Sequence, residues 1–138
     1  MRAINKLIGV LFISLLATSC ATAPVKLDQK YNFDNELQEV KGIINYKIDS
    51  WQPIDSQSLI IQTDVNDYYL VILQQPAPDL PYTETIGATV TVNEVKPGYD
   101  VIIVSDSSGA TPYVIQKIYK LNGREQAQEI RKQVINSK

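Results

Sequence analysis

Residues 57–73, which read QSLIIQTDVNDYYLVIL, decide the fold. In the first arm, 59–62, alternate side chains would share a face, which is the two-residue period of a strand. The sequence at 64–67, Asp-Val-Asn-Asp, favours a turn, because Asp and Asn side chains bond their own backbone. The second arm, 68–73, is apolar on both faces. We therefore expect a hairpin whose second strand lies in the centre of a sheet.

Short strands are also expected on both sides of this hairpin. Before it, Ile44, Tyr46 and Ile48 alternate with polar residues, and a strand continues through Trp51 to Ile54. After it, strands are expected at residues 85–95 (with Ile86, Ala88, Val90 and Val92 on one face), 101–104 and 114–121.

The period changes after residue 121. Ala127, Ile130 and Val134 form one narrow apolar stripe of a helix at about 123–136, with Asn122 as its N-cap and Glu125 as the capping-box partner. The pattern predicts a mainly β fold: a small antiparallel barrel or curled sandwich of about six or seven strands with one C-terminal amphipathic helix that covers an open end or edge.

A short apolar run near the N-terminus precedes the only cysteine of the chain. Residues 7–17 are too few for a membrane-spanning helix, which needs roughly 20 apolar residues, but they fit the core of a signal peptide. Residues 17–20, Ala-Thr-Ser-Cys, resemble the lipobox of bacterial lipoproteins. This resemblance implies a signal peptide at 1–19 and a diacylglyceryl group on the Cys20 thiol. The alternative is an ordinary signal peptide with Cys20 nearby by chance.

The expected domain organisation follows from this anchor. Residues 20–37 would form the lipidated cysteine and a flexible tether, and 38–138 a single β-rich domain. Acyl chains on Cys20 would hold the protein to a membrane. Because Ala21 stands where Asp would act as an inner-membrane retention signal, the lipoprotein resemblance implies the periplasmic face of the outer membrane.

A second resemblance covers roughly residues 38–121. The segments that carry it are Trp51-Gln-Pro-Ile-Asp, 69–73, Pro76-Ala-Pro-Asp-Leu, Ile86-Gly87, Asp100-Val101 and 112–118. Together they resemble the uncharacterised bacterial lipoproteins of the domain-of-unknown-function family 6491. That family usually has cysteines where this chain has Ala77 and Tyr113. The resemblance implies that these two residues lie close in space, within the reach of a disulfide.

The side chains available for catalysis are few. The chain has no histidine, and its one cysteine is assigned to lipid, so Ser-His-Asp and Cys-His chemistry are excluded and no metal or cofactor is expected. Asp49 and Asp55 flank Trp51 and could form a glycosidase-type carboxylate pair, but strand-end and turn roles are the stronger interpretation. The run 64–67 lacks the glycine and distal glutamate of a calcium loop. We expect Asp100 to fix the turn at 97–98.

Two functions remain open. The chain has 13 Lys and Arg against 15 Asp and Glu and a net charge of −2, which argues against nucleic-acid binding. We expect a non-enzymatic lipoprotein of the cell envelope that acts through contacts with an envelope protein. The alternative is a module that binds a small ligand or glycan on a tyrosine-rich sheet face. Most tyrosines are expected to be packed, because Tyr half-buries well in strands. The tyrosines in question are Tyr46, Tyr68, Tyr69, Tyr82, Tyr99, Tyr113 and Tyr119.

Overall fold

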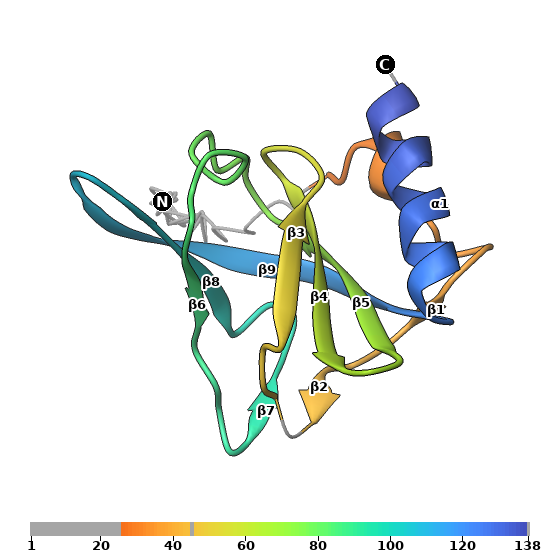
Figure 1. Cartoon of the computed structure of the whole chain (residues 1–138), viewed down its shortest axis with the longest axis horizontal. Helices are drawn as coiled ribbons and strands as arrows, with labels where there is room; N and C mark the ends of the chain where they lie inside the picture. The colour runs from red at the N-terminus through yellow and green to blue at the C-terminus, as the bar shows by residue number, and fades with distance from the viewer. Residues whose placement is uncertain (1–25, 45, 138) are drawn as a thin grey trace, which may run out of the picture.

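The computed structural model describes residues 26–44 and 46–137, so the expected signal peptide and Cys20 lie outside the described residues. Its main feature is a seven-stranded antiparallel sheet that curls into a half-barrel (Figure 1). Along the sheet the order is β3-β4-β5-β9-β8-β6, and β1 pairs with β9 beside this path. These strands are β1 (Gln38–Glu39), β3 (Ser50–Pro53), β4 (Ser58–Asp64), β5 (Asp67–Leu73), β6 (Ile86–Ala88), β8 (Val101–Asp106) and β9 (Gly109–Leu121). The predicted mainly β, curled fold with one C-terminal helix is confirmed.

The predicted central hairpin is β4 and β5. Asp64 pairs with Asp67, which leaves a two-residue turn between the arms. β5 lies between β4 and β9, as its apolar faces predict. Val71 and Leu73 contact a cluster on one face of the sheet, whereas Leu70 and Ile72 contact a cluster on the other.

β9 joins the two halves of the sheet. Residues 115–121 pair with β5 and residues 109–114 pair with β8, while β1 pairs at 119–120. The β5–β9 register skips Gln116, which is a β-bulge. This extra residue lets Ile115 and Ile118, three positions apart, contact the same cluster. The bulge therefore accompanies the curl of the sheet.

Two hydrophobic clusters hold the sheet from its two sides. We call the first the inner core; its buried members are Ile43, Leu59, Ile61, Val71, Leu73, Ala77, Leu80, Ile86, Val95, Ile102, Val104, Ile115 and Ile118. We call the second the helix-side core; its buried members are Tyr31, Phe33, Leu37, Ile60, Leu70, Ile72, Tyr119, Leu121, Ala127, Ile130 and Val134. Each buried Leu, Ile or Val contributes about 1.5–3 kcal/mol.

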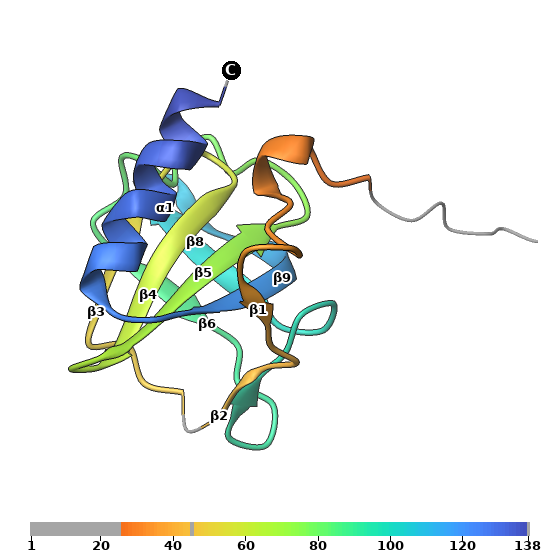
Figure 2. The same ribbon diagram turned by 90° about the vertical axis from the view of Figure 1, so that its right-hand side faces the viewer.

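The C-terminal helix α1 (Arg124–Asn136) lies across the sheet (Figure 2). The predicted stripe of Ala127, Ile130 and Val134 is its buried face. The predicted N-cap is wrong by one residue: Gly123 is the N-cap, with a φ of 95° that favours glycine, and it offers no side-chain cap. Instead, the Gln126 side chain accepts a hydrogen bond from the Asn122 N–H at 2.6 Å.

The tether prediction is wrong for its last part. A short 3-10 helix, η1 (Gln29–Tyr31), is capped by the Asp28 carboxylate, which accepts from the Lys30 N–H. Tyr31, Phe33 and Leu37 are buried in the helix-side core. Residues in this segment therefore belong to the folded body, because their apolar side chains complete the layer that α1 begins.

Two predicted strands are shorter than expected. Upstream, the only strand between residues 41 and 49, among those described, is β2 (Ile43–Ile44), which pairs with β7 (Glu94–Val95). Ile43 is buried and Ile44 is 71% exposed, the reverse of the predicted faces. Residues 46–49 are not in a strand, although Tyr46 and Ile48 pack against the inner core.

The second correction concerns residues 85–95. β6 ends at Ala88, and Thr91 then pairs with Glu94 around a tight turn. Val92 and Asn93 in that turn have φ values of 52° and 62°. Two successive positive φ values are those of a type I′ turn, which reverses the chain and ends the expected strand. Val92 is consequently 91% exposed.

Candidate functional site

A groove of about 740 Å³ lies between α1 and strands β3 to β5. Its floor comes from the strands: Ser50, Trp51 and Gln52 of β3, Ile60 and Gln62 of β4, and Tyr68 of β5. Its wall comes from α1: Arg124, Gln128, Arg131, Lys132 and Ile135. We refer to it as the helix–sheet groove.

The register of the edge strand explains where the polar residues of the floor lie. Gln52 pairs with Ile60, a member of the helix-side core, so the two side chains share a face. Ser50 pairs with Gln62 in the same way, and its hydroxyl donates to the Gln62 side-chain oxygen at 2.8 Å. Polar residues thus occupy the helix-facing side of the sheet where α1 does not cover it.

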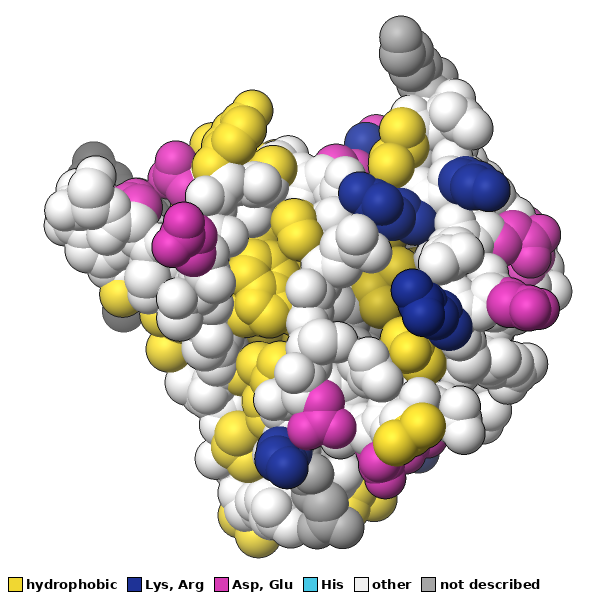
Figure 3. Space-filling view, in the orientation of Figure 1, with side chains coloured by type: hydrophobic (Ala, Val, Ile, Leu, Met, Phe, Trp, Pro, Cys, Tyr) yellow, Lys and Arg dark blue, Asp and Glu magenta, His cyan; other side chains and the backbone are white. Residues whose placement is uncertain are grey.

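The spacing of residues on α1 explains why the wall is cationic. Arg124, Gln128, Arg131 and Ile135 follow one another at intervals of four, three and four residues. At 3.6 residues per turn they form a stripe beside the buried one. Figure 3 shows Lys and Arg side chains along the side of α1 toward the sheet and across its front, and acidic side chains at its outer edge.

The cations of the groove have no internal counter-ion. No acidic residue is among those that line it, although the chain as a whole carries a net charge of −2. Within the described part of the chain, no ion pair involves Arg124, Arg131 or Lys132. The Nε of Arg131 is buried and has no hydrogen-bond acceptor. An orphan buried donor of this kind costs about 1–3 kcal/mol where neither water nor a bound group supplies an acceptor.

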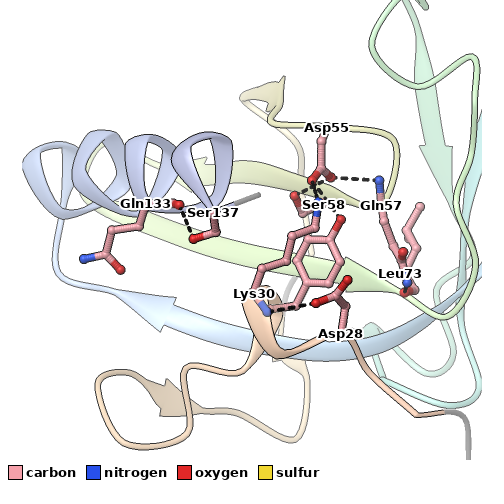
Figure 4. A network of polar contacts seen from close by, with 9 residues as sticks. Asp28, Lys30, Asp55, Gln57, Ser58, Leu73, Gln133 and Ser137 are labelled. Carbon is pink, nitrogen blue, oxygen red and sulfur yellow. Dashed lines mark hydrogen bonds and ion pairs between the residues drawn. The ribbon is translucent and has the colours of Figure 1, made fainter.

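The carboxylate of Asp55, by contrast, is fully occupied by donors of its own chain. It accepts hydrogen bonds from the Tyr31 hydroxyl and the Ser58 hydroxyl at 2.8 Å, the Gln57 N–H at 2.9 Å and the Lys30 ammonium at 3.0 Å (Figure 4). Burial raises the pKa of Asp55, but these donors outweigh it and hold the pKa below the ordinary value of 3.8. Asp55 therefore fixes η1 to the β3–β4 connection.

Asp100 is a second internal hub. Its buried carboxylate accepts from the Lys96 N–H at 2.8 Å, Thr89 at 2.9 Å and Thr91 at 3.0 Å. Burial raises its pKa and the donors lower it, with a net decrease below 3.8. The bond to Lys96 spans Pro97 and Gly98, so the expectation that Asp100 fixes this turn is confirmed.

Asp34 binds the N-terminal segment to β9. Its carboxylate lies 2.7 Å from the Lys117 ammonium and accepts from the Tyr119 hydroxyl at 2.8 Å. These bonds, Lys117 first, hold the pKa of Asp34 below its ordinary value. The Tyr119 hydroxyl also accepts from the Phe33 N–H at 3.3 Å, and the two rings meet edge to face. The network ties residues 33 and 34 to the sheet.

The other candidates from the sequence do not form a site. Asp49 precedes β3 and Asp55 follows Ile54, so the strand alone, roughly 13 Å long at about 3.3 Å per residue, exceeds the distance of about 5–9.5 Å between glycosidase carboxylates. The run 64–67 is a plain hairpin turn, with Asp67 ion-paired to Lys120. The described residues contain no group of three or more His, Cys, Asp or Glu that could hold a metal.

The tyrosines are mostly packed, as expected. Tyr82 and Tyr99 are the only large exposed rings among the described residues. Tyr113 packs against the inner core, which also contains Ala77, so the two positions for which the family resemblance implies cysteines share a cluster. Their close approach as a disulfide pair stays a prediction.

Sequence reasoning missed the helix–sheet groove. The apolar period identifies the buried stripe of α1 but does not single out Arg124, Arg131 or Lys132. The available signal was the spacing of Arg124, Gln128, Arg131 and Ile135 beside the apolar stripe, opposite a strand end with Ser50 and Gln52 in place of apolar residues.

Comparison with known proteins gives one match. In the described ranges, no helix has both the length and the apolar character needed to cross a membrane. Neither a curated protein nor a solved structure matches this chain. A family model of unknown function, DUF6491, matches residues 3–137, nearly the whole length. The chain therefore belongs to the DUF6491 family.

Proposed function

We propose that this protein is a lipid-anchored component of the cell envelope that acts through protein contacts rather than by catalysis. The proposed anchor is Cys20, and the proposed place is the periplasmic face of the outer membrane. The internal hubs support a non-catalytic role, because the carboxylates of Asp55 and Asp100 already accept three or more bonds each from their own chain. Such groups stabilise the fold and have little capacity left for a substrate.

The observation that carries the proposal is the helix–sheet groove with its unpaired cations. A half-buried guanidinium that lacks acceptors is costly to a folded chain unless water, a ligand or a partner supplies them. Arg131 combines a charge, a buried Nε without an acceptor and a place in the groove wall. A partner that supplies acceptors to Arg131 would remove this cost on binding.

Crosslinking in living cells tests the protein contact. A photoreactive amino acid replaces Gln128, which lines the groove, and in a matched strain it replaces Glu129, the next residue, which does not. We expect a discrete crosslinked protein from position 128 that mass spectrometry identifies reproducibly, and none from position 129. Equal yields of the same products from both positions, or no protein adduct from either, would contradict the proposal.

Lipid labelling tests the anchor separately. Cells fed radiolabelled palmitate should label the wild-type protein and the Ser19→Ala control, whereas Cys20→Ala should remain unlabelled and leave the membrane fraction. A Cys20→Ala protein that still incorporates label and sediments with membranes would refute lipidation at this residue.

A second candidate is the binding of a small ligand or glycan. The volume of the groove, about 740 Å³, lies within the roughly 300–1,000 Å³ of ligand sites, and its floor offers hydroxyl and amide groups. Calorimetric titration of the full-length protein with neutral and acidic oligosaccharides tests this function. Binding that Gln52→Ala abolishes would favour it.

A further inference from the structure

We propose that the helix–sheet groove binds an extended acidic segment of a partner protein, with Arg124, Arg131 and Lys132 holding its carboxylates. This inference rests on the proposed function and adds the chemistry of the partner. Charge complementarity supports an acidic ligand. The groove presents three cationic side chains and is lined by no acidic residue, although the net charge of the chain is negative.

The separation of the cations indicates a ligand with several charges. Arg124 and Arg131 are seven residues apart on α1, which is about 10.5 Å along the helix at 1.5 Å per residue. One small anion would contact only one end of this stripe. An extended peptide advances about 3.3 Å per residue, so carboxylates roughly three residues apart meet both ends.

Arg131 is the anchor of the site. Among the described residues, its guanidinium has no hydrogen-bond acceptor and no ion pair, and its Nε is buried. A carboxylate in the groove can accept from both terminal nitrogens of the guanidinium at once, and this bidentate geometry is a strong and specific pairing for arginine. Lys132, the next residue, adds a second positive charge beside it. A bound carboxylate would thus give acceptors to a guanidinium that has none among the described residues.

The remaining lining favours a peptide over an acidic sugar. Gln52 on the floor and Gln128 on the wall make no side-chain hydrogen bonds within the described part of the chain, and an amide both donates to and accepts from a peptide backbone. Sugars are usually held by an open aromatic face. Trp51 and Tyr68 also line the groove, but each is half-buried, Trp51 against the inner core and Tyr68 against the helix-side core, so only part of each ring is available. Ile135, which is 50% exposed, can contact an apolar side chain at the end of the segment.

Fluorescence anisotropy with full-length protein in detergent tests the inference. The probe is a fluorescein-labelled peptide of alternating Glu and Ser that ends in Leu, and its control has Gln in place of Glu. We expect binding of the Glu peptide that weakens as salt is added. Arg131→Gln and Arg124→Gln should each weaken it about tenfold and the double variant about 100-fold, while Lys41→Gln, an exposed lysine outside the groove, leaves it unchanged.

The opposite results are equally definite. Equal affinity for the Glu and Gln peptides, or an equal loss with Lys41→Gln, would overturn the inference. So would binding of oligogalacturonate that depends on Arg131 when the Glu peptide does not bind, because the ligand is then an acidic glycan. Thermal unfolding of each variant verifies its fold, and Arg124, which is exposed, gives an independent readout if Arg131→Gln is unstable.

The failure of this inference is distinguishable from the failure of the proposed function. If crosslinking from position 128 identifies a partner but the purified protein binds the Glu and Gln peptides equally, the proposed function stands. The acidic segment is then refuted. An absence of any protein adduct, together with tight binding of the Glu peptide to the purified protein, would instead refute the function in cells.

Discussion

Replacing Asp55 by alanine should destabilise the protein by about 2–5 kcal/mol. The variant leaves the hydroxyls of Tyr31 and Ser58 without the acceptor that they reach at 2.8 Å, and both residues are buried. An unsatisfied buried donor costs about 1–3 kcal/mol. The loss of the ion pair with Lys30 adds only about 0–1 kcal/mol, because the Lys30 ammonium is partly exposed and is solvated by water in the variant. These losses sum to about 2–7 kcal/mol, and alanine also avoids the cost of burying the Asp55 carboxylate, so the expected loss lies in the lower part of that range, at about 2–5 kcal/mol.

Urea and thermal unfolding followed by circular dichroism measure this effect. At about 4 °C per kcal/mol for a domain of this size, the unfolding midpoint of Asp55→Ala should fall by about 8–20 °C. Asp49→Ala is the matched control, since Asp49 is exposed and has only a 3.5 Å ion pair with Lys47. It should change stability by less than about 0.5 kcal/mol.

The result that would refute this reasoning is a small loss, below about 1 kcal/mol, in Asp55→Ala. It would mean that Tyr31 and the segment around it contribute little to the folded state. A double-mutant cycle with Tyr31→Phe isolates their shared hydrogen bond: the two losses should be less than additive by about 1 kcal/mol or more. Strict additivity would show that the hydroxyl and the carboxylate act independently.

Three further predictions concern other parts of the fold. The donors around Asp100 hold its pKa below 3.8 in the folded protein. Its contribution to stability is therefore complete at pH values above the pKa of the unfolded state and is lost as the pH falls through the lower pKa of the folded state. Urea titrations between about pH 2 and 5 should show a steep decline of the free energy of unfolding in the wild type and a flatter one in Asp100→Asn. Val92→Gly should stabilise the protein by about 1 kcal/mol in chemical denaturation, because glycine tolerates a φ of 52°. Val90→Gly, at a neighbouring site without a positive φ, should give no gain. A loss of stability in Val92→Gly would contradict backbone strain at this position. Ile130→Ala should cost about 2–4 kcal/mol by thermal unfolding, because Ile130 is buried beneath α1, whereas Glu129→Ala should change stability by less than about 0.5 kcal/mol; similar values for both would show that the helix is not docked.

The parts of the fold that the sequence predicts are those with a long local pattern. The hairpin at 58–73 and the helix from 124 to 136 each repeat one period over several turns or residues. β1 and β2 contain two residues each, too few for any period, and they exist because β9 and β7 pair with them. The segment that contains η1 reads as polar spacer, yet Asp34 bonds Tyr119, 85 positions away. Such contacts depend on the completed sheet and have no local signature.

The helix–sheet groove depends on an orientation that no local pattern specifies. On one side of the apolar stripe, α1 carries Arg124 and Arg131, and on the other side it carries Gln126 and Gln133. Both flanks are polar, so amphipathicity predicts which stripe is buried but not which flank lies over the open end of the sheet. The direction in which α1 crosses the strands decides this, and it places the arginine flank beside Ser50 and Gln52. Had the helix crossed with the glutamine flank on that side, the same sequence pattern would have made a neutral groove. The charge of the site is therefore a property of tertiary packing.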